Sequence, residues 1–194
     1  MASGKKNASR LKASLVFIDE SGLMMAPLVR RSWAPRGQTP VLWQRTRSHR
    51  KVSIIAALCI SPQRDHVQLL FRLHPDCNIR TLQAKAFLKA LLKQLGTPVI
   101  VVWDNLQVHR AKTVQDFVAS EKTLRAAFFP PYAPELNPVE YLWAYLKFNP
   151  LANHAFFEIN ELAHEARRSS RKIQHDQILL RSFVEHSPLS LRLM

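Results

Sequence analysis

The sequence predicts an α/β fold in which a mixed β-sheet is covered by helices. Two observations support this prediction: apolar, strand-like runs joined by turn residues fill the first part of the chain, and helical and strand patterns alternate after residue 79. Hairpin strands followed by β-α-β alternation are typical of a mixed sheet with helices packed against it. The length of 194 residues corresponds to about one domain that can bury a proper core.

The expected strands are apolar runs bounded by turn residues. The first covers 15–18 and ends at "DESG", so residues 19–22 are predicted to form a hairpin turn before the apolar run resumes. A basic loop punctuated by Pro and Gly follows, with a short edge strand expected around 41–43. The remaining strands are expected over 52–60, 66–73, 97–104 and 124–129.

Helices are expected where apolar residues recur at intervals of three and four. This spacing covers 79–95 and is followed by Gly96, which suits the left-handed position after a helix. A third helix is predicted to start within "PELNPVEYLWAYLKF". The other helical patterns cover about 109–120, 156–168 and 174–185.

Charge is the most pronounced feature of the composition. The chain has 28 Lys and Arg against 14 Asp and Glu, a net charge of +14 and a pI near 10.5. Such an excess costs self-repulsion and favours a polyanionic partner, so we expect nucleic acid. A membrane partner is not expected, because no apolar run approaches the roughly 20 residues that span a bilayer and the basic residues do not form one face of an amphipathic helix.

The terminal and cysteine patterns exclude a secreted protein, a disulfide framework and a structural zinc site. The first fourteen residues are basic and contain no apolar segment of a secretory signal, so a cytoplasmic, nucleoid-associated location is expected. The two cysteines, Cys59 and Cys77, are too few for a disulfide framework. His74 and Cys77 form a single H-x-x-C, which lacks the second half of a zinc site.

Three acids stand where predicted elements begin or end. Asp19 follows the first strand and Asp104 follows "VVW", and each has an ordinary interpretation as a turn residue or a helix cap. Glu140 lies near the start of the third helix, where Asn137 as cap and Pro138 as first residue would make it part of a capping box. Those local interpretations leave the combination of the three acids unexplained.

A convergent set of three carboxylates has a specific chemistry. Such groups repel one another and raise one another's pKa unless a cation lies between them. Hard oxygen ligands suit Mg²⁺ or Mn²⁺. Two such ions about 3.5–4 Å apart can activate an attacking water or 3′-hydroxyl and stabilise the leaving oxygen of a phosphodiester. The acids and the basic surface together therefore favour metal-dependent cleavage of nucleic acid, with two Mg²⁺ or Mn²⁺ ions as cofactors.

The chain also carries a resemblance to a known family. It rests on "LVFIDESG", "WAPRGQTPVL", "VVWDNLQVHRA" and "FFPPYAPELNPVEYLWAYLK". From about Ser14 to Phe183 the chain resembles the DDE-superfamily transposases of bacterial insertion sequences related to the mariner elements. The resemblance implies a ribonuclease H-like fold, shared with retroviral integrases. We therefore expect a mixed five-stranded sheet with helices on both faces and a C-terminal helical extension.

The resemblance also implies a division of the chain and a function. We expect a basic N-terminal segment over 1–13, a catalytic core over 14–150, and a C-terminal helical extension of the same domain over 151–194. The implied function is that of a transposase catalytic domain, which cleaves DNA phosphodiester bonds and transfers strands during transposition. The expected partners are DNA, as transposon ends and target, a second copy of the chain in a homodimer, and a separate DNA-recognition subunit.

By this resemblance Asp19, Asp104 and Glu140 are both the catalytic residues and the metal ligands. Asn105 and His109 belong to the same block as Asp104 and are accessory candidates that would touch a phosphate or orient a metal-bound water. A capping Asn and a solvent-facing His account for them equally well.

Glu20 is expected on the opposite face of the first strand from Asp19 if that strand continues, since side chains alternate along a strand. It is therefore not expected to bind the metal.

The basic loop between the first strands supplies the DNA-binding candidates. Arginine suits bidentate contact with phosphate, and an interleaved aromatic residue such as Trp43 would stack on an unpaired base. A solvated loop is the ordinary alternative. The same alternative applies more strongly to the charge run over 167–172, which is expected between two helices. The DNA-binding candidates of the loop are Arg45, Arg47, Arg50 and Lys51.

The sequence departs from the family at its beginning. The relatives carry a helix-turn-helix region that recognises the ends of the element, whereas eighteen residues precede Asp19 here. We expect a catalytic half of a split transposase, a separately encoded catalytic domain, or a remnant. The alternative function is accordingly a catalytically silent DNA-binding remnant, which binds DNA or a full-length relative non-specifically.

Overall fold

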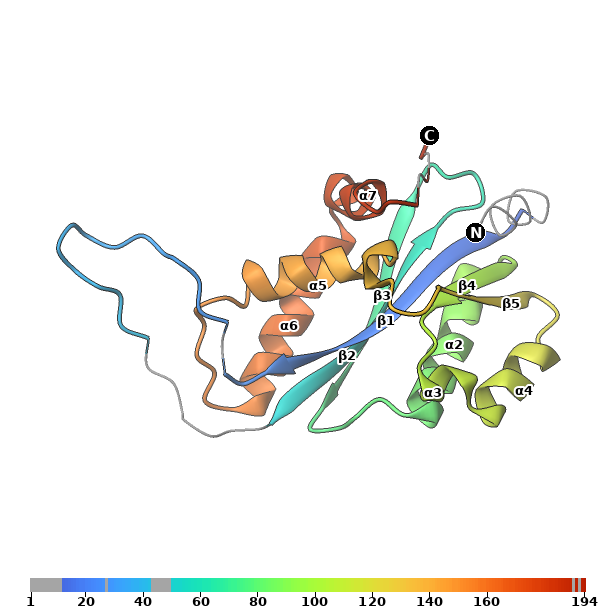
Figure 1. The fold of residues 1–194 in the computed structure, drawn as a ribbon, viewed down its shortest axis with the longest axis horizontal. Helices are drawn as coiled ribbons and strands as arrows, with labels where there is room; N and C mark the ends of the chain where they lie inside the picture. Colours follow the sequence, from blue (N-terminus) through green and yellow to red (C-terminus); the bar gives the residue numbers. More distant parts are fainter. Residues whose placement is uncertain (1–11, 27, 43–49, 190, 192) are drawn as a thin grey trace.

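A computed structural model describes residues 12–26, 28–42, 50–189, 191, 193 and 194. These residues form a five-stranded sheet with helices on both faces (Figure 1). In chain order the elements are β1 (Ser14–Met24), β2 (Lys51–Ile60), β3 (Val67–Pro75), α2 (Thr81–Leu95), β4 (Val99–Trp103), α3 (Gln107–Arg110), α4 (Lys112–Ser120), β5 (Leu124–Phe128), the 3₁₀ helix η1 (Pro134–Leu136), α5 (Val139–Phe148), α6 (Ile159–Gln174) and α7 (Gln177–Glu185).

The strands are ordered β3-β2-β1-β4-β5 across the sheet. β1, β2 and β3 pair antiparallel, whereas β4 and β5 run parallel to β1. The predicted mixed five-stranded sheet is therefore confirmed. Because β1, β4 and β5 are parallel, their carboxyl ends lie at one edge of the sheet, which is where open α/β sheets bind ligands.

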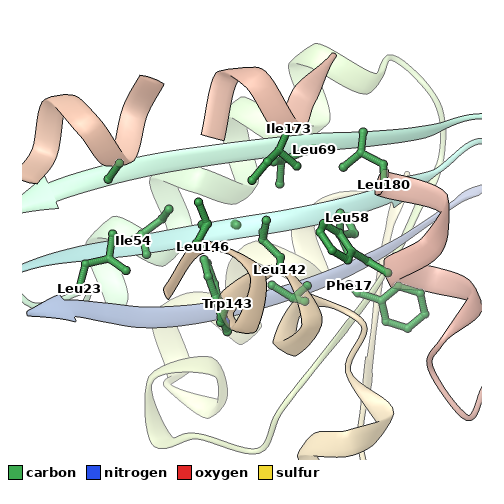
Figure 2. Close-up of a cluster of buried hydrophobic side chains, with 14 of the residues drawn as sticks. Phe17, Leu23, Ile54, Leu58, Leu69, Leu142, Trp143, Leu146, Ile173 and Leu180 are labelled. Atoms are coloured by element: carbon green, nitrogen blue, oxygen red, sulfur yellow. The ribbon is translucent and has the colours of Figure 1, made fainter. Parts of the chain in front are cut away.

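Helices bury both faces of the sheet, as predicted. On one face α5, α6 and α7 cover alternate strand residues such as Phe17 and Leu58, and Figure 2 shows Leu142 and Leu146 of α5 among them. On the other face α2 and α4 cover the intervening residues, including Val16 of β1. Burial on both sides explains why the central strands are nearly continuous apolar runs.

The C-terminal helices are joined to the sheet at its β3 edge. Gln177 accepts a hydrogen bond from the Val67 backbone N–H (3.2 Å) and donates one to the Val67 carbonyl oxygen (2.7 Å). Gln174 donates to the Leu69 carbonyl oxygen (2.7 Å). These side chains occupy backbone groups that an edge strand would otherwise expose. α6 and α7 share one core with the sheet. The division of the chain into a catalytic core and an extension at residue 150 remains a prediction.

The predicted turn over residues 19–22 is wrong. β1 continues to Met24, and its antiparallel ladder with β2 runs from Leu15 opposite Ile60 to Met24 opposite Lys51. β4 ends at Trp103, so the last part of β1 has no parallel neighbour, and residues 19–22 are only half-buried, which tolerates polar residues. The expected edge strand around 41–43 is absent at Val41 and Leu42, and residue 43 lies outside the described part of the chain.

The helix expected over 79–95 is confirmed as α2, and Gly96 follows it with φ of 61°. The helix expected over 109–120 is divided, because Ala111 is extended (φ −57°, ψ 137°) and separates α3 from α4. The Gln115 side chain donates to the His109 carbonyl oxygen (2.7 Å) across this break. Local sequence does not indicate it, since alanine is a good helix former.

The charge run over 167–172 lies within α6 and not between two helices. α6 is continuous to Gln174, with Ser169 and Ser170 turned inward and the basic residues exposed. The chain turns only at Asp176, whose side chain caps α7 by accepting from the Leu179 backbone N–H (2.9 Å). Among the helices of the described residues, none is long and apolar enough to cross a membrane.

Candidate active site

The three predicted acids lie where the parallel pairing of β1 with β4 ends. Asp19 is on β1, Asp104 directly follows β4, and Glu140 is in the first turn of α5. The parallel ladder between β1 and β4 ends with Phe17 opposite Val102. Asp19 and Asp104 each follow this last pair by two residues, so both aspartates lie just beyond the end of the ladder.

Helix α5 brings Glu140 and Trp143 to Asp19. The indole Nε1–H of Trp143 donates to Asp19 Oδ2 (2.7 Å). Residues three apart on a helix share a face, so Glu140 lies on the same side of α5 as Trp143. The proximity of Glu140 also appears in the electrostatics. Burial raises the pKa of Asp19 to about 7, the Trp143 hydrogen bond opposes that rise, and the charges of Glu140 and Glu20 add to it.

Asn137 fixes the start of α5 against β1. Its buried side chain donates to the Ile18 carbonyl oxygen (3.2 Å) and accepts from the Val139 backbone N–H (3.2 Å). Ile18 immediately precedes Asp19, so this contact sets the position of Glu140 relative to that acid. The predicted capping box does not form, because within the described residues no hydrogen bond links the Glu140 side chain to the Asn137 backbone.

Replacing Asn137 with alanine is expected to lower the free energy of unfolding by about 2–3 kcal/mol. Two buried backbone groups would each lose a partner, at about 1–3 kcal/mol apiece. Asn149→Ala is the matched control, because Asn149 is exposed at the other end of α5 and donates once, to the Tyr145 carbonyl oxygen. Urea unfolding of both variants measures the difference, and equal losses would contradict the role of Asn137.

Asp104 is held by two donors on one oxygen. Its Oδ1 accepts from the Leu106 backbone N–H (3.1 Å) and from Nδ1 of His109 (2.7 Å). Burial acts to raise the pKa of Asp104, but these two hydrogen bonds outweigh it and leave the pKa below its ordinary value. Asp104 is therefore ionised, and its Oδ2 has no hydrogen-bond partner among the described residues.

His109 is a buried link between two carboxylates. Its side chain is 0% exposed and stacks on Trp103, with ring centroids 4.2 Å apart and planes 9° apart. Nε2 lies 3.0 Å from Glu20 Oε1, while Nδ1 binds Asp104. Carboxylate oxygens only accept, so both ring N–H groups donate. Burial acts to lower the pKa of His109, but the hydrogen bonds to Asp104 and Glu20 raise it to about 10. The solvent-facing alternative for His109 is wrong.

Asn105 joins the ends of β4 and β5. Its side-chain Nδ2 donates to the Phe129 carbonyl oxygen (3.0 Å). α3 begins at Gln107 without a side-chain cap, so the capping alternative for Asn105 is also wrong.

The DNA-binding candidates are placed only in part. Arg45 and Arg47 lie outside the described residues, as do Trp43 and His49 of the same loop. Arg50 is exposed and paired with Asp76 through two of its N–H groups. Lys51 is the first residue of β2 and lies opposite Met24. Met24 is five residues beyond Asp19, which is roughly 17 Å along a strand. Arg50 and Lys51 are therefore remote from Asp19 and are not part of the candidate site.

The acids offer suitable oxygens for a divalent cation. Asp19 Oδ1, Asp104 Oδ2 and both oxygens of Glu140 have no hydrogen-bond partner within the described part of the chain. Burial raises the pKa of Glu140, Lys147 opposes that rise, and the charge of Asp104 adds to it. The donor chemistry therefore fits a hard cation. In the residues that the structure describes, no three His, Cys, Asp or Glu lie close enough together to hold a metal ion.

Sequence reasoning missed three residues that contact the candidate site residues: Asn137 as a link to β1, Trp143 as a donor to Asp19, and Glu20 as a partner of His109. Trp143 is indicated by its spacing of three from Glu140. Glu20 does lie on the opposite face of β1 from Asp19, but its contact with His109 joins residues 89 positions apart and has no local sequence signal.

A family model described as DDE superfamily endonuclease matches residues 14–163. The chain belongs to the DDE superfamily endonucleases. A comparison with curated proteins finds no match.

Solved structures of Mos1 share the fold of this DDE superfamily member. The Mos1 strand transfer complex matches with a TM-score of 0.67 and 19% identity, over 96% of this chain and 55% of the Mos1 chain. The Mos1 mariner paired end complex with Mn matches with a TM-score of 0.67 and 18% identity, over 96% of this chain and 57% of the Mos1 chain. The catalytic domain of Mos1 mariner transposase matches with a TM-score of 0.61 and 17% identity, over 96% of this chain and 82% of the domain's chain. The expected ribonuclease H-like fold is confirmed, and this chain spans little more than half of the Mos1 chains in the complexes.

Proposed function

We propose that this DDE superfamily member is a transposase catalytic domain that cleaves DNA phosphodiester bonds and transfers strands with a divalent metal. The observation that carries the proposal is the placement of three acids on one side of the sheet: Asp19 on β1 where its pairing with β4 ends, Asp104 directly after β4, and Glu140 in the first turn of α5. The three acids come from distant parts of the sequence, and such ends are where α/β sheets bind ligands.

Electrostatics favours a bound cation among the acids. The pKa of Asp19 rises to about 7 through burial and the neighbouring charges of Glu140 and Glu20. A dication between the carboxylates would remove that repulsion and keep all three ionised. Mos1 paired end complexes are known with Mn and with Mg, which supports the same metals here.

Each protein group has a distinct task in this proposal. Asp19, Asp104 and Glu140 hold the metal, Trp143 orients Asp19, and Asn137 sets the start of α5. When bound, two Mg²⁺ or Mn²⁺ ions supply activation of the attacking oxygen and stabilisation of the leaving oxygen. Among the described residues the three acids do not lie close enough together to hold one ion between them, so binding through all three would require a smaller separation.

DNA is the proposed substrate and partner. The net charge of +14 favours a polyanion, and binding to it is expected to weaken steeply with salt. The Mos1 neighbours include a paired-end complex with the left transposon end, which supports transposon ends as substrate. Arg45, Arg47, Arg50 and Lys51 are proposed phosphate contacts. A homodimer and a separate DNA-recognition subunit are proposed as the assembly.

One observation favours a second function. The absence of a three-ligand metal site among the described residues also fits a catalytically silent remnant that binds DNA through its charge. Such a protein would bind without metal and would lose affinity as salt rises.

Nicking of supercoiled plasmid distinguishes the two functions. The full chain is incubated with plasmid in Mn²⁺, in Mg²⁺ and in EDTA, and the relaxed product is measured over time. The transposase proposal predicts nicking in both metals and none in EDTA. Salt-sensitive binding in a gel-shift assay, without nicking in either metal, would support the remnant and overturn the proposal.

A further inference from the structure

His109 links Glu20 of β1 to Asp104 after β4, and the function proposed above gives Glu20 and His109 no task. Consecutive residues of a strand point to opposite faces, so Asp19 faces α5 while Glu20 faces α3. His109 reaches Glu20 with Nε2 (3.0 Å) and Asp104 with Nδ1 (2.7 Å). Both acids of the "DE" pair on β1 are thereby connected to the candidate site, one directly and one through the imidazole.

We propose that Glu20 and His109 are positioning residues that hold the Asp104 carboxylate in one orientation, with Oδ2 as the oxygen that binds the metal. This inference rests on the proposed function. Oδ1 already accepts from both His109 and the Leu106 backbone N–H, so Oδ2 is the oxygen of Asp104 that has no partner among the described residues.

The imidazole of His109 is fixed in several ways. The ring is fully buried and lies nearly parallel to the indole of Trp103, the residue before Asp104. The backbone carbonyl of His109 accepts from Gln115 (2.7 Å), which ties the residue to α4. A ring that is stacked on one face and bonded at both nitrogens cannot rotate without leaving buried polar groups unpaired, which is unfavourable.

Glu20 completes this support. Its side chain is 16% exposed, and its Oε1 accepts the Nε2–H that would otherwise be buried without a partner. With Nε2–H bound to Glu20, Nδ1–H is the donor left for Asp104. Metal-binding carboxylates and histidines are commonly oriented by such outer hydrogen bonds, and their loss costs about 10–100-fold in metal affinity or activity.

Variants of Glu20 separate positioning from charge and from folding. Glu20→Ala removes the acceptor for Nε2–H. Glu20→Gln removes the same charge but keeps an oxygen that can accept that hydrogen bond. Asp116→Asn removes an exposed carboxylate on α4 that is not part of the Glu20–His109–Asp104 chain. Mn²⁺ affinity by calorimetry, nicking rate and thermal melting are measured for each full-length variant.

We expect Glu20→Ala to weaken Mn²⁺ binding and nicking about 10-fold, and Glu20→Gln to restore both to within about 3-fold of the wild type. His109→Phe keeps an aromatic ring against Trp103 but donates nothing, so a loss of about 10–100-fold is expected. Asp116→Asn is expected to match the wild type.

Two results would overturn the inference while leaving the proposed function in place. One is wild-type Mn²⁺ affinity in both Glu20→Ala and a folded His109→Phe. The other is an equal loss in Glu20→Ala and Glu20→Gln, which would show an effect of charge alone. If His109→Phe does not fold, the two Glu20 variants decide the matter. A wild-type chain that neither binds Mn²⁺ nor nicks DNA overturns the proposed function and this inference together.

Discussion

Replacing Asp104 with asparagine is expected to lower the rate of Mn²⁺-dependent plasmid nicking by at least about 10³-fold. The amide keeps the shape of the side chain and can still accept from the Leu106 backbone N–H, but it removes the charge proposed to bind the metal. Charge stabilisation by a bound metal is worth several kcal/mol in a transition state, and about 4 kcal/mol corresponds to that factor. Single-turnover nicking rates measure the loss.

Asp116→Asn is the matched control for this experiment, because it makes the same chemical change on the exposed side of α4. It is expected to nick at the wild-type rate. DNA binding in EDTA is expected to be equal in the wild type and in Asp104→Asn, since the basic surface is unchanged. Residual nicking by Asp104→Asn within 10-fold of the control would show that Asp104 does not hold the metal.

Replacing Asp19 with asparagine is expected to abolish nicking to a similar degree while stabilising the metal-free protein above pH 7. The folded state raises the pKa of Asp19 from 3.8 to about 7, so it binds this proton more tightly than the unfolded chain does. The contribution of Asp19 to stability is therefore full below pH 4 and is lost as the pH rises to about 7. The asparagine side chain carries no charge and keeps an oxygen for the Trp143 indole.

Thermal melting in EDTA at pH 4 to 8 measures this effect as the difference between variant and wild type. At pH 8 the variant is expected to melt about 2–4 °C higher, which corresponds to roughly 1 kcal/mol for a chain of this size. The pKa of His109 is raised to about 10, so its stabilising contribution is full below pH 6.5 and is lost as the pH rises toward 10. This loss is the same in both proteins and cancels in the difference. Saturating Mn²⁺ is expected to stabilise the wild type and not the variant. A variant that melts lower than the wild type at pH 8 would contradict the account.

The elements predicted correctly are those whose local pattern follows from burial. β2 and β4 are buried on both faces and read as continuous apolar runs, and α2 ends at Gly96. The turn wrongly predicted over 19–22 has turn-forming residues. Whether they turn depends on β2, which is long enough to pair with β1 as far as Met24. The break at Ala111 is bridged by the hydrogen bond from Gln115 to His109, and the alanine itself does not indicate it.

The candidate site was predictable to the extent that its residues lie at element ends. Asp104 and Glu140 have that property, whereas Asp19 was placed at a strand end that the structure does not have, since β1 continues to Met24. The joint role of the three acids remains a prediction. The link from Glu20 to His109 was not predictable, because it requires knowing that β1 and β4 are neighbours and which face α3 covers. Spacing along α5 could have indicated Trp143. The DNA contacts of Arg45 and Arg47 also remain predictions, since these residues lie outside the described part of the chain.

The position of bound Mn²⁺ tests the central claim most directly. Anomalous diffraction from crystals of the full chain grown with Mn²⁺ locates the ion without reference to activity. The account predicts that Mn²⁺ is bound by Asp104 Oδ2, with one oxygen each from Asp19 and Glu140 and none from Glu20. Mn²⁺ bound elsewhere on the chain, or no anomalous signal at these acids at millimolar Mn²⁺, would contradict it.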